Sequence, residues 1–133
     1  MVITQEQLPM VALASMNDTH LEDIIIINEL ARLIDEERSD EITEKLDALV
    51  AHTVEHFAGE EVMMLEKGFP PYQMHKAEHD KALAQLKEVA QYWKEHKDLK
   101  ALSHYIKVFM PAWLVQHVST MDTVTARFLV TVQ

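Results

Sequence analysis

Five histidines and two carboxylates stand out in this sequence because of their types and their spacing. They are His20, His56, Glu60, His75, His79, His117 and Asp122. His56 and Glu60 are four residues apart, as are His75 and His79, so each pair would lie on one face of a helix. Such faces, meeting in the core of a helix bundle, can surround a metal ion with imidazole nitrogens and carboxylate oxygens. This mixed ligand set suits transition metals better than calcium or magnesium.

The spacing of His117 and Asp122 is less favourable, because an ideal α-helix places residues i and i+5 about 140° apart. The two side chains can share a site only if the site lies between them, if the aspartate reaches round the helix, or if a π-bulge closes the angle. His20 has no partner at helical spacing.

The number of candidate ligands indicates the kind of metal centre. Seven protein ligands are too many for one tetrahedral zinc ion. They suit two six-coordinate ions bridged by two carboxylates, with one coordination position left open. The excess of imidazole over carboxylate leaves more positive charge on the metal ions, which favours reversible redox chemistry over cleavage of oxygen.

The composition indicates a single acidic, helical domain. The chain has 133 residues, of which 48% are hydrophobic, and a formal net charge of −10; this length fits one domain with one core. Only two glycines and four prolines occur, and so few helix breakers disfavour a turn-rich β fold. The negative charge predicts that the protein does not bind nucleic acid or anionic lipid.

Cysteine is absent, which excludes disulfides, iron–sulfur clusters and thiolate zinc sites and fits a reducing compartment. The first residues lack the basic start of a secretory signal and include Glu6. No apolar run approaches the ~20 residues of a transmembrane helix. We therefore expect a cytoplasmic monomer with no membrane association.

Hydrophobic periodicity predicts four helices, at about residues 17–37, 40–67, 71–96 and 99–131. Asn17 or Asp18 could cap the first helix, and Gly68 is placed to end the second. Short connections predict an all-α, antiparallel up-down-up-down four-helix bundle with a short N-terminal arm, in a single domain over residues 1–133. The apolar face expected for the first helix consists of Leu21, Ile24, Ile25, Ile27, Leu30 and Ile34.

Pro111 falls inside the fourth predicted helix. Proline removes one backbone hydrogen bond and usually kinks or interrupts a helix. We therefore predict a bend or break between Phe109 and Trp113, after which the helix restarts and carries His117 and Asp122.

A zinc-peptidase pattern offers a weaker explanation of the same residues. Residues 52–56 and 75–79 both fit H-x-x-E-H, in which two histidines bind zinc and the glutamate acts as a base. A bundle of this size has no obvious substrate cleft, so we interpret Glu55 and Glu78 as surface charges.

Ferritin-like di-iron oxidases are a second alternative with the same fold, and they use Glu-x-x-His on two helices. No histidine of this chain has a glutamate three positions before it, so the chain does not match that class. Of the remaining histidines, we expect His52 to approach the site, because it lies one turn before His56, and His96 and His104 to be exposed.

Four motifs occur in order along the chain and cover roughly residues 16–130. They are Asn17-x2-His20, His56-Phe57-x2-Glu60-Glu61, His75-x3-His79-Asp80 and Trp113-Leu114-x2-His117-x4-Asp122. Together they resemble the hemerythrin family, and in particular its bacterial members, which are haem-free, O2-binding di-iron proteins.

The resemblance implies a centre of two iron ions, cycling between Fe2+ and Fe3+. Three histidines would bind one iron and two would bind the other, with two carboxylates and a solvent-derived oxo or hydroxo group as bridges. O2 would bind on the side with two histidines. The three-histidine side is His75, His79 and His117, the two-histidine side is His20 and His56, and the bridging carboxylates are Glu60 and Asp122.

The resemblance also implies an apolar pocket for O2, lined by Phe57, Trp113, Leu114 and Val118. Such a lining excludes water and protons and so slows autoxidation, although these residues also suit ordinary core packing. The implied function is reversible O2 binding for storage, delivery or sensing, without catalysis, with an O2-requiring enzyme as a recipient. A sensor, iron-handling or detoxification role at the same site remains the alternative.

The sequence departs from the family pattern in three places. The family often has aspartate where Asn17 stands, which affects the support available to His20. The usual N-terminal aromatic segment is missing, so the end of the bundle should be covered differently. Pro111 lies close before Trp113, at the approach to the expected pocket.

Overall fold

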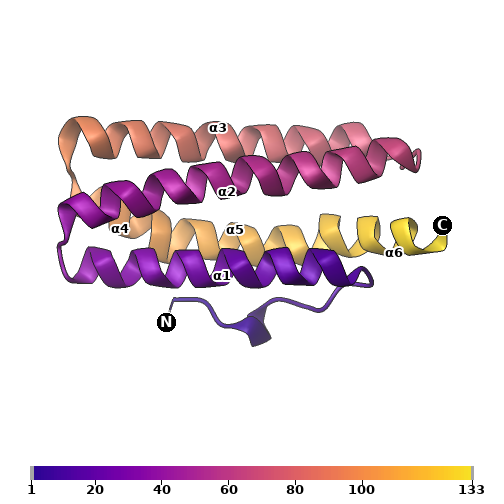
Figure 1. Cartoon of the computed structure of the whole chain (residues 1–133), viewed down its shortest axis with the longest axis horizontal. Coiled ribbons are helices and arrows are strands. Elements are labelled where there is room, and N and C mark those ends of the chain that lie inside the picture. The colour runs from indigo at the N-terminus through magenta and orange to yellow at the C-terminus, as the bar shows by residue number, and fades with distance from the viewer. Residues whose placement is uncertain (1, 133) are drawn as a thin grey trace.

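The computed structural model describes residues 2–132, and within them four long helical stretches run side by side (Figure 1). The first three are α1 (Ala14–Asp35), α2 (Ser39–Glu66) and α3 (Tyr72–His96). The fourth is a composite of α4 (Leu99–His104), η2 (Tyr105–Phe109), α5 (Met110–His117), η3 (Val118–Asp122) and α6 (Thr123–Thr131). Both η2 and η3 are π-helical. A short 3₁₀ turn, η1 (Gln5–Gln7), lies in the N-terminal arm.

The helices pack as an antiparallel bundle. α1 contacts α2, α2 contacts α3, and the composite fourth helix contacts α1 and α3. Short turns at 36–38, 67–71 and 97–98 connect them, as Figure 1 shows. The predicted all-α up-down-up-down bundle is therefore confirmed. Among residues 2–132, no helix is both long and apolar enough to cross a membrane.

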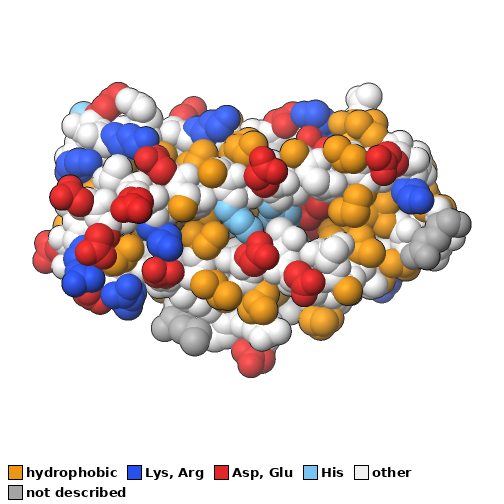
Figure 2. Space-filling model, viewed as in Figure 1, with side chains coloured by type: hydrophobic (Ala, Val, Ile, Leu, Met, Phe, Trp, Pro, Cys, Tyr) orange, Lys and Arg blue, Asp and Glu red, His pale blue; other side chains and the backbone are white. Residues whose placement is uncertain are grey.

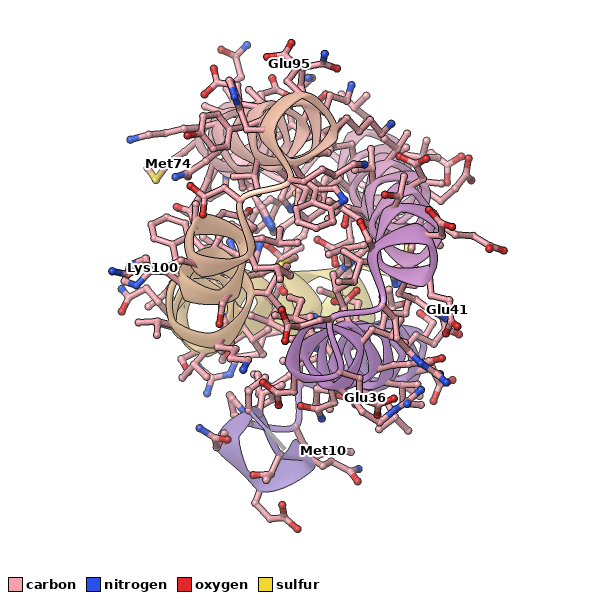
Figure 3. The ribbon with its side chains drawn as sticks, turned by 90° about the vertical axis from the view of Figure 1, so that its left-hand side faces the viewer. Met10, Glu36, Glu41, Met74, Glu95 and Lys100 are labelled. Atoms are coloured by element: carbon pink, nitrogen blue, oxygen red, sulfur yellow. The ribbon has the colours of Figure 1, made fainter. Side chains whose placement is uncertain are left out.

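The core is built from side chains that recur every three or four residues along each helix. The view along the bundle shows side chains filling its interior, while Glu41, Glu95 and Lys100 point outward (Figure 3). One face of the surface carries interspersed acidic and basic side chains (Figure 2). On α2 the buried stripe runs through Ile42, Leu46, Leu49, Thr53, His56, Phe57, Glu60 and Met64. The stripe that drives folding thus also carries two of the candidate ligands.

The apolar face of α1 is narrower than expected. Ile24 and Ile27 are buried, but Leu21 and Ile25 are 38% and 55% exposed. Each of these two follows a buried residue, His20 and Ile24, and one further residue turns the side chain about 100° away from the core. The prediction that Leu21 and Ile25 belong to the buried face was wrong.

The end of α2 and the start of α1 test two predictions about helix termini. Gly68 ends α2 as predicted: its φ is +65°, its amide donates to the Leu65 carbonyl, and the Phe69 amide donates to the Met64 carbonyl. This pair of bonds is a Schellman motif, which needs the left-handed conformation that glycine adopts freely. The expected cap at Asn17 or Asp18 was wrong, because α1 begins earlier, at Ala14.

Pro111 does not break the fourth helix. Phe109 and Met110 keep helical dihedral angles, with φ and ψ of −67° and −54° and of −65° and −44°. The irregularity expected near the proline takes the form of the π-helical segment η2, which ends directly before α5. A π turn widens the helix and accommodates a residue that cannot join the regular hydrogen-bond ladder.

The N-terminal arm lies along α1 and is fixed by asparagines. Asn28 accepts hydrogen bonds from the amides of Val2 (3.0 Å) and Ile3 (3.2 Å) and donates to the Ile3 carbonyl (2.8 Å). Ile3 is fully buried as a result. Asn17 pairs in the same way with the amide and carbonyl of Val11, both at 2.9 Å. The sequence lacks the N-terminal aromatic segment that the resemblance led us to look for, and an arm with aliphatic side chains occupies this end of the chain instead.

Replacing Asn28 with alanine should release the start of the arm. Two amides and one carbonyl lose their partners and Ile3 loses its cover, so we expect the free energy of unfolding to fall by about 1–3 kcal/mol. Hydrogen exchange at the Ile3 amide should accelerate. Asn28→Asp, which keeps the acceptor for both amides, should lower the free energy of unfolding by less. Unchanged exchange at Ile3 in Asn28→Ala would show that packing alone holds the arm.

Candidate metal centre

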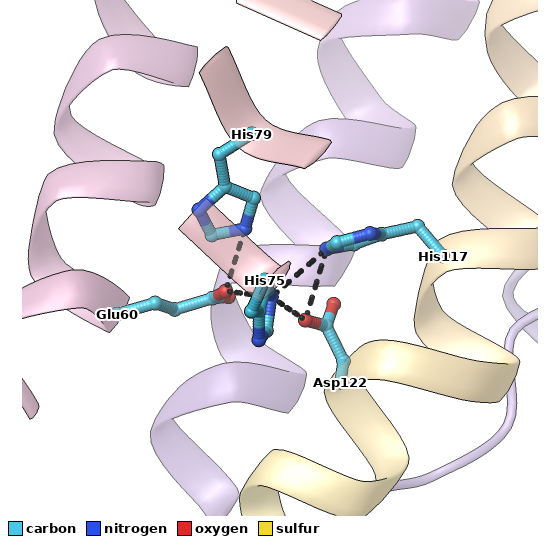
Figure 4. A group of neighbouring side chains, drawn as sticks. All are labelled: Glu60, His75, His79, His117 and Asp122. Atoms are coloured by element: carbon cyan, nitrogen blue, oxygen red, sulfur yellow. Dashed lines mark hydrogen bonds and ion pairs between the residues drawn. The ribbon is translucent and has the colours of Figure 1, made fainter. Parts of the chain in front are cut away.

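The structure brings all seven predicted ligands together in the middle of the bundle, and each is at most 8% exposed. α1 supplies one residue, α2 and α3 supply two each, and the composite fourth helix supplies the last two. Five of them are drawn in Figure 4. Every long helix therefore contributes to the centre.

One half of the centre consists of three imidazoles facing two carboxylate oxygens (Figure 4). Glu60 Oε1 lies 3.2 Å from His79 Nε2 and 3.5 Å from His75 Nε2. Asp122 Oδ1 lies 3.1 Å from His117 Nε2 and 3.2 Å from His75 Nε2. The Nε2 atoms of His75 and His117 are only 3.2 Å apart. This group is the three-histidine side.

The other half uses the second oxygen of each carboxylate. Glu60 Oε2 lies 2.7 Å from His56 Nε2, and Asp122 Oδ2 lies 2.9 Å from His20 Nε2. Each carboxylate thus presents one oxygen to the three-histidine side and the other to the two-histidine side. This is the arrangement that a bridging carboxylate requires.

The π-helical segment η3 explains how His117 and Asp122 reach one site. It covers Val118–Asp122, the five residues that follow His117. A π-helix turns less per residue than an α-helix, so the angle between the His117 and Asp122 side chains becomes much smaller than about 140°. Of the solutions that the i+5 spacing allowed, the structure adopts the π-bulge. The Thr123 hydroxyl donates to the Val118 carbonyl at 2.7 Å within the same turn.

The outer nitrogens of four imidazoles are held by partners behind them. Three partners are carboxylates, which only accept hydrogen bonds, so these three Nδ1 atoms carry the proton and the Nε2 lone pairs point into the centre. Metal-binding histidines are oriented in this way. The contacts are His56 to Asp23 (3.2 Å), His79 to Glu61 (3.0 Å), His117 to Glu78 (2.7 Å) and His75 to the Thr125 hydroxyl (2.8 Å).

Most of these supporting residues were not identified from the sequence. Glu78 was interpreted as a surface charge, and that interpretation was wrong; Glu55 is exposed, as expected. A signal was present for two others: Asp23 follows His20 by three residues on an otherwise apolar face, and Thr125 follows Asp122 by three. Glu61 belongs to a recognised motif, but the sequence alone does not assign it a partner.

His20 differs from the other four histidines. Its Nδ1 is buried and has no hydrogen-bond partner among residues 2–132. Asn17, the residue at the expected supporting position, uses both polar atoms of its side chain on Val11 instead.

Each carboxylate at the centre is surrounded by several imidazoles, which shift its pKa. Burial by itself raises the pKa of Glu60 and Asp122, but contacts from the surrounding histidines outweigh burial and hold both pKa values below their usual range. Burial lowers the pKa of His75, yet its two carboxylate neighbours raise it to about 9. The neighbouring carboxylates also raise the pKa values of His56 and His117 against the effect of burial. A cation that binds to His56, His75 or His117 would therefore displace a proton from the Nε2 atom that faces the centre.

The donor atoms fit transition-metal ions. Glu60 Oε1, His79 Nε2 and Asp122 Oδ1 are buried and make no hydrogen bond within the described part of the chain. Leaving such a group unsatisfied costs about 1–3 kcal/mol, and a cation at the centre would satisfy all three. Imidazole nitrogens and carboxylate oxygens in this ratio suit iron and its neighbours.

A small cavity of about 20 Å³ adjoins the centre beside His56 and His117. Three of the predicted pocket residues, Phe57, Trp113 and Leu114, line it, whereas Val118 is fully buried elsewhere in the core. Its lining also includes Asp23, Thr53 and Met110. Phe57 stacks on His79 with ring centroids 4.0 Å apart, and Trp113 stacks on His117 at 4.5 Å.

Comparisons with known proteins agree with this geometry. The family model described as the hemerythrin HHE cation binding domain matches residues 11–129. A bacteriohemerythrin of Aquifex aeolicus is 32% identical over 129 residues, or 97% of this chain and 98% of that protein. A bacteriohemerythrin of Methylococcus capsulatus is 31% identical over 106 residues, covering 80% and 79%.

A crystal structure of wild-type hemerythrin superposes with a TM-score of 0.81 and 26% sequence identity, covering 97% of each chain. The matched segment spans every residue of the centre, from His20 to Asp122. With sequence, fold and donor arrangement in agreement over nearly the whole chain, this protein belongs to the hemerythrin family.

Proposed function

We propose that this protein binds O2 reversibly at a non-haem di-iron centre and serves in O2 storage, delivery or sensing. The observation that carries the proposal is the two-sided placement of Glu60 and Asp122, each with one oxygen toward each group of histidines. Two ions held between the same two carboxylates would lie close enough to act as a pair. When bound, they would supply the two electrons that O2 takes up and returns on release.

The two sides offer different numbers of donors. Three imidazoles and two carboxylate oxygens face one position, and two imidazoles and two carboxylate oxygens face the other. A solvent-derived bridge would complete six ligands on the first side and leave the second side with a free position. We therefore place O2 binding on the two-histidine side.

The adjoining cavity suits a small apolar ligand. It lies between His56 of the two-histidine side and His117 of the three-histidine side, and is walled mainly by apolar side chains. Its volume of about 20 Å³ is just above the ~10–15 Å³ that one water-sized molecule needs. Binding sites for organic substrates are larger, typically about 300–1,000 Å³, so the cavity favours O2 itself and a carrier or sensor role over catalysis.

The residues of the pocket have a protective role in this proposal. Phe57 and Trp113 cover two ligand imidazoles, and Leu114 closes the cavity. An apolar wall excludes water and protons, which would otherwise promote irreversible oxidation of the irons. An O2-requiring enzyme is the proposed recipient, and sensing, iron handling or detoxification would use the same centre.

Metal analysis and visible spectroscopy test this function directly. The protein loaded with ferrous iron under anaerobic conditions should hold about two irons per chain. Exposure to O2 should produce a visible absorption band that disappears when O2 is removed. A single bound zinc, or immediate irreversible oxidation with turnover of an added substrate, would contradict the proposal.

Replacing His117 with alanine should abolish stable loading of two irons. The change removes one imidazole from the three-histidine side and leaves Glu78 without its partner, so we expect one iron or fewer per chain by metal analysis. His104→Ala, which removes an exposed imidazole of α4, should retain two. Two irons in His117→Ala would exclude this residue as a ligand.

Replacing Leu114 with asparagine should shorten the life of the O2 complex. The substitution keeps the branched shape but places an amide in the wall of the cavity, where it attracts water. We expect autoxidation, followed as the loss of the O2-dependent band, to become several-fold faster, and the melting temperature to fall. Leu114→Met, which keeps the wall apolar, should stay close to the wild type. Equal autoxidation rates in the two variants would contradict the protective role proposed for Leu114.

A further inference from the structure

A buried carboxylate connects His56 to a sixth imidazole, which is not a candidate ligand. Asp23 Oδ2 accepts from His56 Nδ1 at 3.2 Å, and Asp23 Oδ1 accepts from His52 Nε2 at 2.8 Å. Asp23 itself is only 5% exposed. Both oxygens of this carboxylate are therefore fixed, one by the candidate ligand and the other by His52.

His52 extends this chain of hydrogen bonds to the surface. Its side chain is 18% exposed, and its Nδ1 lies 3.7 Å from the exposed carboxylate of Glu22. Figure 2 shows histidine atoms reaching the surface midway along the face formed by α1 and α2, with acidic side chains on either side. The carboxylates that support His79 and His117 have no second imidazole behind them within residues 2–132.

The two-histidine side depends on this support more than its counterpart does. His20, the other histidine there, has no partner for its Nδ1 among the described residues. On the three-histidine side each of the three imidazoles has a partner. Asp23 and His56 also line the cavity beside the centre, so His56 is the one supported imidazole on the two-histidine side and it borders that cavity.

We propose that His52 is a positioning residue which, by holding Asp23 in place, orients His56 and sets how firmly the two-histidine side retains its iron. This inference rests on the proposed di-iron function. Without His52, Asp23 Oδ1 would lose the imidazole that donates to it, and the carboxylate could turn away from His56. Partners behind a metal-binding histidine typically affect metal affinity about 10–100-fold.

Iron release tests the role of His52. Wild type, His52→Leu, His52→Gln and His96→Leu are loaded with ferrous iron under anaerobic conditions and then mixed with excess ferrous chelator. In His52→Leu we expect one of the two irons to leave at least ~10-fold faster than in the wild type, while the other leaves at the wild-type rate. Glutamine can donate to Asp23 through its amide, so His52→Gln should largely restore retention. His96→Leu removes an exposed imidazole at the end of α3 and should have no effect.

The visible spectrum of the oxidised protein and the thermal unfolding of the metal-free protein separate positioning from folding. We expect a shifted spectrum in His52→Leu, restored in His52→Gln, with similar melting temperatures for the metal-free forms. Unchanged release in His52→Leu, equal acceleration for both irons, or failure of His52→Gln to restore retention would each overturn the role of His52. Fewer than two irons in the wild type would instead overturn the di-iron function on which this role rests.

Discussion

The structure depends on one electrostatic constraint: five imidazoles and two carboxylates are buried together in the middle of the core. Charged and polar groups removed from water are costly unless each finds a partner. The inner atoms of this cluster face one another at 2.7–3.5 Å, and four of the five outer imidazole nitrogens are satisfied by side chains behind them. Three inner atoms keep no hydrogen bond within the described residues. These three unsatisfied atoms are the strongest indication from the structure itself that the core is completed by cations.

The fourth helix shows how the backbone serves this cluster. A regular α-helix would turn Asp122 away from His117, and the π-helical segment η3 brings both to the centre and sets Thr125 behind His75. π turns have poorer hydrogen-bond geometry than α turns and tend to occur at functional sites. The apolar side chains above and below the centre, including the fully buried Leu46, Met64 and Ile106, stabilise the bundle. The polar middle specifies how its helices must be aligned, since only one register brings all seven side chains together.

The sequence predicted the bundle because the bundle follows from helical periodicity, and the same periodicity groups four of the seven candidate ligands. His56 with Glu60 and His75 with His79 are i, i+4 pairs, and any helix containing them presents them together. His20, His117 and Asp122 came from family resemblance. His20 has no partner at helical spacing, and the i, i+5 spacing of His117 and Asp122 could not decide whether η3 would form. The partners of the outer nitrogens were largely missed, because Glu78 looks like any surface glutamate until the bundle places it against His117. Leu21 and Ile25 were wrongly predicted to be buried, since hydrophobicity alone does not define the edge of a buried stripe. The helix accommodates Pro111 through the π-helical segment η2 and does not break there.

The two sides of the centre differ in a way that would suit the proposed reversible binding of O2 at one of them. On the three-histidine side, every imidazole has a partner, two aromatic rings cover His79 and His117, and the protein supplies nearly all the donors that an ion needs. On the two-histidine side, fewer donors would face an ion, and only one of the two imidazoles is oriented from behind. That imidazole, His56, borders the small cavity that also touches His117. His56 is held by Asp23, which is held in turn by the partly exposed His52. In the proposed function, such a difference between the two sides would allow a ligand to bind and leave without disturbing the bundle, because the change would be confined to the side with fewer protein donors.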